Sequence, residues 1–430
     1  MPTTTLDLHA RPAFDAALPD LARLLGRIEA ELARRGQLGL LSVTVLQRSG
    51  SPAHDGWEDY EITLRAISSF LTRFAGRRMR SSDLPLAPIV SGNTFIVLLA
   101  PPRDNRSMDG ADVALVHGRL LAGLHAFLAR RLPTSAQERF GVYVGRSIMR
   151  HDPAVGRERI VYRSLEQALA DALSQQEQEG HRQAACLSRL LESGGVRSVY
   201  QPVVDLVSRR VVGYEALTRV PRRHFRTPDL LFKTAQQNGV LWALERLCRR
   251  RALEGLGGLD GEQLVFLNVE PESLLDPELR SAGFLCQLQQ AQLAPGRVVL
   301  ELTEHAAVQD FAALREVLGE FRALGFRLAM DDVGSGYAGL RAIAEIAPDY
   351  LKVDMSLVRD LHRHALKREL VATILRFSES TGIALVAEGV ESREELEALA
   401  RTGVRCAQGY LFARPSRAPQ PPDWDTLALR

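Results

Sequence analysis

"LAMDDVGSGYAGL", residues 328–340, places two adjacent aspartates, Asp331 and Asp332, at the end of an apolar run and follows them with three glycines. Taken alone, such a cluster is most simply a turn, because Asp and Gly are common turn residues. The strands in the rest of the chain decide whether the aspartates also have a chemical role.

Similar units of an apolar strand followed by a helix recur after residue 197. Strands are expected at residues 198–206, 211–220, 263–270, 297–304, 326–332, 349–354, 383–390 and 407–412. Repeated units of this length predict an α/β fold, a (β/α) TIM-like barrel. The first two strands are joined too tightly for a helix, so one antiparallel strand is expected. An open doubly wound sheet shares this periodicity, but the chain has no Gly-rich dinucleotide fingerprint to favour it.

The first half has a different pattern, in which amphipathic helices alternate with short strands and a hairpin around "SGNT". This order predicts an α+β domain with one antiparallel sheet. The polar stretch 174–183 lacks proline, so a continuing helix is expected there. We therefore expect a first domain over 1–181, a connecting helix over 182–196 and the barrel over 197–430.

Composition excludes several classes of protein. The chain has 430 residues and a formal net charge of +2, so bulk charge gives no argument for nucleic acid or an anionic membrane as a partner. No signal peptide and no apolar run of about 18 residues is evident. The four cysteines have no paired spacing, which favours buried, reduced thiols in a cytoplasm over a disulfide framework or a zinc site.

Polar residues recur where the predicted barrel strands end. They are Glu215, Asn268, Glu270, Glu301, Glu304, Asp331, Asp332, Lys352, Asp354, Glu388, Glu391 and Gln408. In a barrel the carboxyl ends of the parallel strands form one rim, so these side chains are expected to converge.

Each of these residues also has a local alternative. Asp and Glu are common in the first turn of a helix, where they interact favourably with the helix dipole. Short polar side chains cap helices, and a side-chain amide can form a hydrogen bond with a nearby backbone group. These alternatives apply to Glu304 and Glu391 as first-turn acids, to Asp354 and Asn268 as caps, and to Gln408 as a local backbone partner.

Converging carboxylates repel one another unless cations lie among them. Oxygen ligands without clustered His or paired Cys favour Mg²⁺ or Mn²⁺ over zinc. Two adjacent aspartates suit two cations about 3.5–4 Å apart, an arrangement that serves in-line displacement at phosphorus. The sequence therefore predicts a site for two divalent cations.

Seven motifs carry this pattern: "YEALTR" (214–219), "LNVE" (267–270), "LELTE" (300–304), "DDVGSGYAGL" (331–340), "LKVD" (351–354), "VAEGVE" (386–391) and "QGYLF" (408–412). Together they cover about residues 190–415 and resemble the motifs of the EAL-domain phosphodiesterases. The resemblance implies hydrolysis of cyclic di-GMP to linear 5′-pGpG and a homodimer formed through the barrels.

The resemblance also implies roles for individual residues. Metal ligation falls to Glu215, Asn268, Glu301, Asp331, Asp332, Glu388 and Gln408. Catalytic or bracing roles fall to Lys352, Glu388, Glu304 and Glu391, and substrate contacts to Gln201, Leu217, Arg219 and Asp354. Lys352 holds or activates the attacking water, and Glu388 acts as the base. Lys352 is one of only three lysines among 54 basic residues, which favours a need for a compact ammonium at this position.

The loop departs from the family pattern at Val333, where phenylalanine is usual, and the smaller side chain is expected to leave the loop more room. The first half resembles the GGDEF cyclase domains more faintly, through its layout and "SGNTF" (91–95). Thr94 replaces a carboxylate needed for cyclase chemistry, so a degenerate, regulatory domain is expected, which binds a protein partner or a nucleotide. "RSSD" (80–83) is interpreted as an exposed turn. The alternative function is a receptor that binds cyclic di-GMP without cleaving it.

Overall fold

The computed structural model describes residues 21–48, 56–78, 83–89, 92–102, 106–220, 225, 227–257, 259–303, 311–334 and 339–425. The chain divides into two compact units, Met1–Ala185 and Cys186–Arg430. Each is described by itself. Glu304, the loop 335–338 and most of "RSSD" lie outside the described residues.

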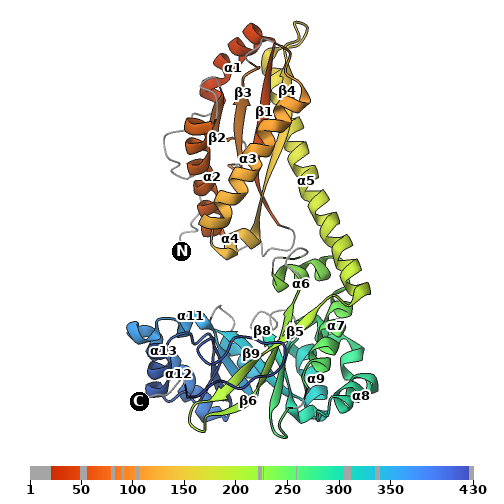
Figure 1. Cartoon of the computed structure of the whole chain (residues 1–430), viewed down its shortest axis with the longest axis vertical. Helices are drawn as coiled ribbons and strands as arrows, with labels where there is room; N and C mark the ends of the chain where they lie inside the picture. Colours follow the sequence, from red (N-terminus) through yellow and green to blue (C-terminus); the bar gives the residue numbers. More distant parts are fainter. Residues whose placement is uncertain are drawn as a thin grey trace, which may run out of the picture. The chain divides into compact units, whose positions relative to one another are not determined.

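The first unit is built on a four-stranded sheet in the order β2-β3-β1-β4, in which every pairing is antiparallel (Figure 1). The strands are β1 (Gln37–Gln47), β2 (Leu84–Ile89), β3 (Thr94–Leu99) and β4 (Phe140–Arg150). The helices are α1 (Leu21–Arg35), α2 (Trp57–Arg78), α3 (Gly110–Arg131) and α4 (Thr134–Arg139). The predicted antiparallel sheet is confirmed, whereas α4 was not predicted.

Both faces of this sheet are covered, which explains why β1 is buried along almost its whole length. Leu41 and Val43 pack in one core with α2 and α3. Leu38 and Leu40 belong to a second core with α1 and with residues 160–168 of the long helix that follows β4. Helix α5 (Arg157–Ser193) then continues without a break through residues 174–183, as the absence of proline predicted.

Among the described residues, α3 is the one helix whose length and composition would allow it to cross a membrane. Four side chains at helical spacing, Val113, Leu120, Leu124 and Leu128, are buried against the first core. One buried stripe of this kind is typical of an amphipathic helix that packs on the core of a globular domain.

The second unit is a closed eight-stranded barrel in the order β10-β11-β12-β5-β6-β7-β8-β9. Its strands are β5 (Arg197–Asp205), β6 (Arg210–Arg219), β7 (Leu264–Asn268), β8 (Val298–Thr303), β9 (Arg327–Val333), β10 (Tyr350–Val353), β11 (Ala384–Ala387) and β12 (Cys406–Ala407). Strand β5 is antiparallel to both of its neighbours, β6 and β12, and the other pairings are parallel. The predicted barrel with one antiparallel strand is therefore confirmed.

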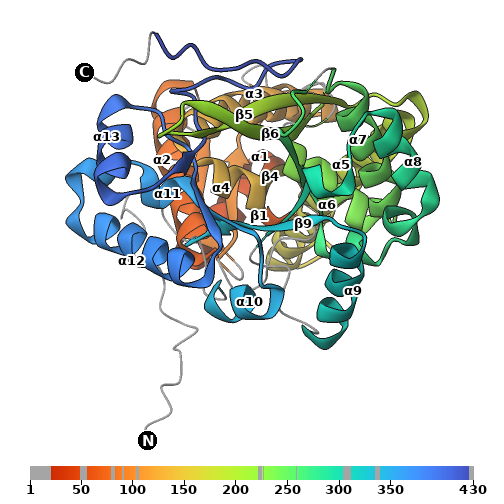
Figure 2. The same cartoon turned by 90° about the horizontal axis from the view of Figure 1, so that it is seen from below.

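Helices surround the barrel, as the view in Figure 2 shows. They are α6 (Pro228–Gln237), α7 (Leu241–Glu254), α8 (Ala282–Gln290), α9 (Phe311–Ala323), α10 (Gly339–Ile346), α11 (Met355–Val358), α12 (Ala365–Thr381) and α13 (Arg393–Thr402). Short 3-10 helices, among them η1 (Pro271–Leu275) and η2 (Pro277–Arg280), follow β7. The eighth strand was predicted too far along the chain: β12 ends at Ala407, and a turn follows.

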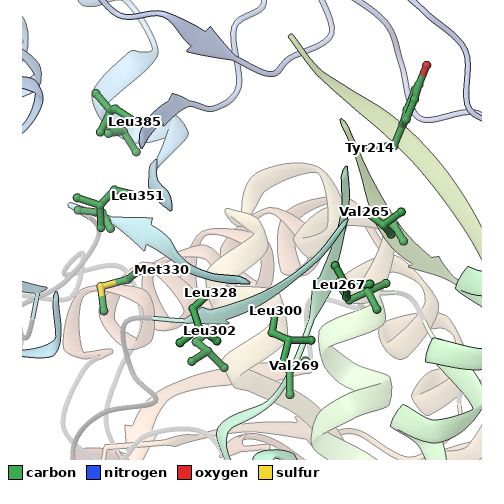
Figure 3. Packing of buried hydrophobic residues seen from close by; sticks show 14 of the residues in the cluster. Tyr214, Val265, Leu267, Val269, Leu300, Leu302, Leu328, Met330, Leu351 and Leu385 are labelled. Atoms are coloured by element: carbon green, nitrogen blue, oxygen red, sulfur yellow. The ribbon is translucent and has the colours of Figure 1, made fainter. Parts of the chain in front are cut away.

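Side chains alternate along the barrel strands, since successive residues of a strand point to opposite faces. Outward residues such as Val265, Leu267, Leu300 and Leu328 belong to the large core between strands and helices (Figure 3). Inward residues fill the barrel itself: the rings of Phe266 and Tyr350, on strands that are not neighbours, lie 5.4 Å apart. Above this apolar layer, the next inward position of each strand is polar.

All four cysteines are free, as predicted. Cys186 is buried, but Cys286 is exposed, so the prediction of buried thiols is wrong for Cys286. The residue lies on α8, whose buried side chains are Phe284 and Leu288.

Candidate functional site

Lys352 lies at the centre of the polar layer and is completely buried. It occupies an inward position of β10, between the apolar Tyr350 and the end of the strand. Its Nζ lies 2.6 Å from Glu388 Oε1, 2.8 Å from Glu301 Oε1, 3.2 Å from Asp331 Oδ1 and 3.6 Å from Glu215 Oε2. One ammonium group is thus shared by carboxylates from four other segments of the barrel.

Side-chain amides complete the layer around Glu215. Asn268 Nδ2 donates to Glu215 Oε1 at 3.0 Å, and Gln408 Nε2 donates to Glu215 Oε2 at 2.6 Å. Gln408 Nε2 also donates to Gln201 Oε1 at 3.1 Å, while Gln201 Nε2 donates to the backbone oxygen of Ala413 at 3.1 Å. The side chains of Asn268 and Gln408 therefore contact the acidic cluster, and their alternatives as a cap and a local backbone partner are wrong.

A β-bulge explains how two adjacent aspartates reach one site. In a regular strand Asp331 and Asp332 would point to opposite faces. The pairing of β9 with β10 shifts between Leu351 and Val353, so both aspartates lie opposite Lys352, and Asp332 has a left-handed φ of 57°. A bulge of this kind re-aims a side chain, and Asp tolerates the left-handed region better than most residues. Ligand atoms of Asp331, Asp332 and Glu388 lie within 4.8 Å of one another.

The buried charges shift one another's pKa values. Burial alone would lower the pKa of Lys352, but the surrounding carboxylates outweigh it and hold this pKa well above its usual value. For Glu301, burial raises the pKa well above its usual range, with like charges on Glu215 and Asp331 adding to the effect. In Glu215 burial is outweighed by the Lys352 charge and the two amide donors, so its pKa is lowered.

Two carboxyl groups at the mouth of the site have raised pKa values. Burial and the negative charges of Asp331 and Asp354 raise the pKa of Asp332 to about 6. Burial raises the pKa of Glu388 to about 8, although the charge of Lys352 opposes this shift. The single ammonium group of Lys352 is therefore not enough to keep all of the surrounding carboxylates ionised.

The residues present fit divalent cations. Five carboxylates (Glu215, Glu301, Asp331, Asp332 and Glu388) accompany a single ammonium group, so the fully ionised set carries a net charge of −4 that two divalent cations would balance. Among the described residues, Glu301 Oε2 and Gln408 Oε1 are buried oxygens with no hydrogen-bond partner. Buried oxygens of this kind ordinarily have a partner, and a cation supplies one.

Other predicted residues lie at the rim and make contacts of their own. Arg219 Nη1 donates to the backbone oxygen of Thr218 at 2.9 Å, and Leu217 is half-buried on β6. Asp354 caps α11, accepting from Ser356 N at 2.9 Å, so its alternative as a cap is confirmed.

Glu391 is exposed and forms an ion pair with Arg359, 3.3 Å away. Its alternative as a first-turn acid is wrong, because α13 begins at Arg393 after the cap Ser392.

Glu395 was missed by the sequence reasoning. Its side chain is 5% exposed and accepts from the backbone N–H groups of Asp360, Glu391 and Ser392, each at 3.0 Å. Burial opposes the effect, but these donors lower its pKa. The signal was present in "SREE", since Ser392 and Glu395 form a capping box that fixes the loop after β11.

A family model described as the EAL domain matches residues 184–415. Among curated relatives, the cyclic di-GMP phosphodiesterase RocR of Pseudomonas aeruginosa is 33% identical over 241 residues, which cover 53% of this chain and 59% of RocR. The bifunctional diguanylate cyclase/cyclic di-GMP phosphodiesterase MucR of the same organism is 25% identical over 351 residues, which cover 77% of this chain and 50% of MucR. The chain spans about half the length of the curated relatives it matches.

Among solved structures, the EAL enzyme Bd1971 in its cGMP-bound form superimposes with a TM-score of 0.52 at 21% identity, covering 65% of this chain and 79% of that one. At this identity the likeness shows the fold alone. It agrees with the closed barrel of the second unit.

Proposed function

The chain belongs to the EAL domain family, and on that premise we propose that its barrel hydrolyses one phosphodiester bond of cyclic di-GMP to give linear 5′-pGpG. The observation that carries the proposal is the buried Lys352 ammonium group, within 3.6 Å of four carboxylates from separate segments. RocR, whose name describes a cyclic di-GMP phosphodiesterase, is 33% identical over 241 residues.

Two divalent cations, Mg²⁺ or Mn²⁺, would be held by Glu215, Asn268, Glu301, Asp331, Asp332 and Glu388, with Gln408 beside them. Bound there, such cations would withdraw charge from the phosphate and lower the pKa of water. The orphaned oxygens and the excess of negative charge support this assignment.

Lys352 and Glu388 have different roles in the proposed reaction. Lys352 keeps its proton because acids surround it, so it can donate to the attacking water or to a phosphate oxygen. Glu388, 2.6 Å from Lys352, accepts the proton that the water loses.

Substrate contacts are assigned at the rim of the barrel. We assign Gln201, Leu217, Arg219 and Asp354 to the dinucleotide, Glu304 to bracing the loop after Asp332, and Glu391 to the surroundings of the site. Gln201 accepts a hydrogen bond from Gln408 at 3.1 Å. Gln408 in turn belongs to the polar side chains around Lys352 that we assign to cation binding, called the metal layer below.

We assign a regulatory role without cyclase activity to the first unit, as a degenerate GGDEF-like domain. The match with MucR covers 77% of the chain and so extends beyond residues 184–415. Thr94 stands in the hairpin where a carboxylate would be needed, and its hydroxyl donates to Thr44 Oγ1 at 3.2 Å.

The decisive experiment is turnover of cyclic di-GMP by the full chain, followed by chromatography of 5′-pGpG, with Mg²⁺ or Mn²⁺ and with EDTA. Product is expected with either cation and not with EDTA. Binding of cyclic di-GMP without turnover under both cations would replace the enzyme by a receptor. A homodimer through the barrels and a cytoplasmic location complete the proposal, and a monomer in light scattering would remove the dimer.

A further inference from the structure

One face of α7 carries two buried charged residues, Glu245 and Arg249, between the exposed Trp242 and Arg246. Trp242, Glu245, Arg246 and Arg249 follow the spacing of one helix face, and Glu245 and Arg249 are only 2% and 3% exposed. This face meets the segment 270–278, which follows β7 and contains η1 and the first residues of η2.

Direct contacts join this face to the segment. Trp242 Nε1 donates to the backbone oxygen of Glu272 at 3.1 Å. Arg246 holds the fully buried Asp276 through Nε at 2.8 Å and Nη2 at 2.5 Å. Arg249 contacts Glu245 at 3.0 Å and Asp276 at 3.4 Å, and it also pairs with Glu278 at 3.1 Å.

Stability alone is a weak reason to keep such a network. Removing charges from water costs several kcal/mol per ion, and well-packed apolar residues often stabilise a protein as well as a buried ion pair does. What a buried network does supply is a fixed position for the groups that it holds.

The group that Glu245 holds lies close to the metal layer. Glu245 Oε1 accepts the backbone N–H of Glu270 at 2.7 Å. Glu270 follows Asn268 by two residues, and Asn268 Nδ2 donates to Glu215 at 3.0 Å. Val269 N in turn donates to the backbone oxygen of Glu301 at 2.9 Å, so the intervening residue is also tied to the metal layer.

We propose that Glu245 is a positioning residue of the metal site: by accepting the Glu270 N–H, it fixes the segment after β7 so that Asn268 meets Glu215 and a cation. This inference rests on the proposed cation site, but not on the identity of the substrate. Arg249 orients Glu245 and is itself anchored by Asp276 and Glu278.

The test is Mn²⁺ binding to the full chain, measured from the electron paramagnetic resonance signal of free Mn²⁺ without substrate. Glu245→Leu removes the acceptor and should raise the Mn²⁺ dissociation constant about tenfold, the lower end of what outer-shell partners of metals contribute. Glu245→Gln keeps an oxygen that can accept the Glu270 N–H, and Arg249 keeps its ion pairs with Asp276 and Glu278. This variant should bind Mn²⁺ within about twofold of the wild type.

Asp205→Asn is the matched control. Asp205 also accepts two backbone N–H groups, from Val207 and Ser208 at 2.9 and 2.8 Å, and pairs with Arg405 at 2.6 Å. It pairs with the first residues of β6 and β12, at the opposite end of the barrel from the metal layer. Asp205→Asn should therefore lower the melting temperature without changing Mn²⁺ affinity.

A double variant separates positioning from folding. Glu245→Leu with Arg249→Met replaces the buried pair by apolar side chains, so its melting temperature should recover relative to Glu245→Leu. Its weakened Mn²⁺ binding should persist. Unchanged affinity in Glu245→Leu, an equal loss in Asp205→Asn, or a wild type that binds no Mn²⁺ would overturn the proposal. A wild type that binds Mn²⁺ but does not cleave cyclic di-GMP would contradict the proposed function and leave the positioning role intact.

Discussion

Replacing Lys352 by methionine tests whether its ammonium group holds the acidic layer together before cations bind. Methionine has a similar length and no charge, so Lys352→Met removes the positive charge with little change in volume. Glu215, Glu301, Asp331 and Glu388 would then face one another without a counter-charge.

The size of the effect follows from burial and distance. Lys352 is completely buried and has four carboxylate oxygens within 3.6 Å of its Nζ. Removing one partner of a buried ion pair costs about 3–5 kcal/mol. Glu301 and Glu388, whose pKa values are already raised, can take up protons, which places the cost near 3 kcal/mol. In a unit of this size, each kcal/mol lowers the melting temperature by about 2–4 °C, so a fall of roughly 6–12 °C is expected.

The assay is thermal unfolding followed by circular dichroism, in EDTA and in excess Mn²⁺. Mn²⁺ should raise the melting temperature of Lys352→Met more than that of the wild type, because the cations replace the lost charge. Turnover should stay abolished at saturating Mn²⁺. Lys233→Met, a substitution of a lysine on α6, is the control and should change the melting temperature much less. An unchanged or higher melting temperature of Lys352→Met in EDTA would refute the reasoning.

Four further outcomes are expected. Glu215→Gln should lower turnover more than about 100-fold, since outer-shell partners alone contribute up to that factor, while circular dichroism shows a folded protein. Asp332→Val should destabilise the chain by about 1–2 kcal/mol in urea unfolding, because a β-branched residue would take the left-handed φ of 57°, whereas Asp332→Asn should keep stability and weaken Mn²⁺ binding. Burial would raise the pKa of Asp276, but hydrogen bonds from Arg246 and a backbone N–H outweigh burial and lower it. The ionised Asp276 therefore stabilises the fold above the pKa that it has in the unfolded chain, and this stabilisation is lost as pH falls. The free energy of unfolding of Asp276→Asn in urea should depend less on pH, between about 5 and 3, than that of the wild type. Incubation with GTP should yield no cyclic di-GMP by mass spectrometry, and synthesis would contradict the degenerate first unit.

Much of the barrel could be predicted because its strands carry two signals at once. Alternation places Val265 and Leu267 outward under the helices, and polar residues follow the last apolar position of each strand. Length and spacing then give strand–helix units that close into a barrel. The eighth strand was misplaced because "QGYLF" has strand-like composition, while its backbone turns after Ala407.

Convergence at the strand ends predicted most of the site, but not its geometry. Nothing in "MDDV" shows that β9 bulges, because a bulge depends on how β9 pairs with β10. Without it, Asp332 would point away from Asp331. Local signals were equally ambiguous at Asp354, where the cap was one of two interpretations and the structure shows that contact.

The network on α7 could not be read from the sequence. Glu245 and Arg249 have the spacing of an ordinary exposed ion pair on a helix, four residues apart. Only the approach of the 270–278 segment buries them. Helix α4 was missed for a related reason: a helix of six residues has too few positions to show a period.

The central claim is that two divalent cations lie among the acids around Lys352. Anomalous diffraction from crystals of the full chain soaked in Mn²⁺ tests it most directly. Two peaks are predicted, bounded by Glu215, Asn268, Glu301, Asp331, Asp332 and Glu388. A map without a peak among these side chains, at a Mn²⁺ concentration that supports turnover, would contradict it.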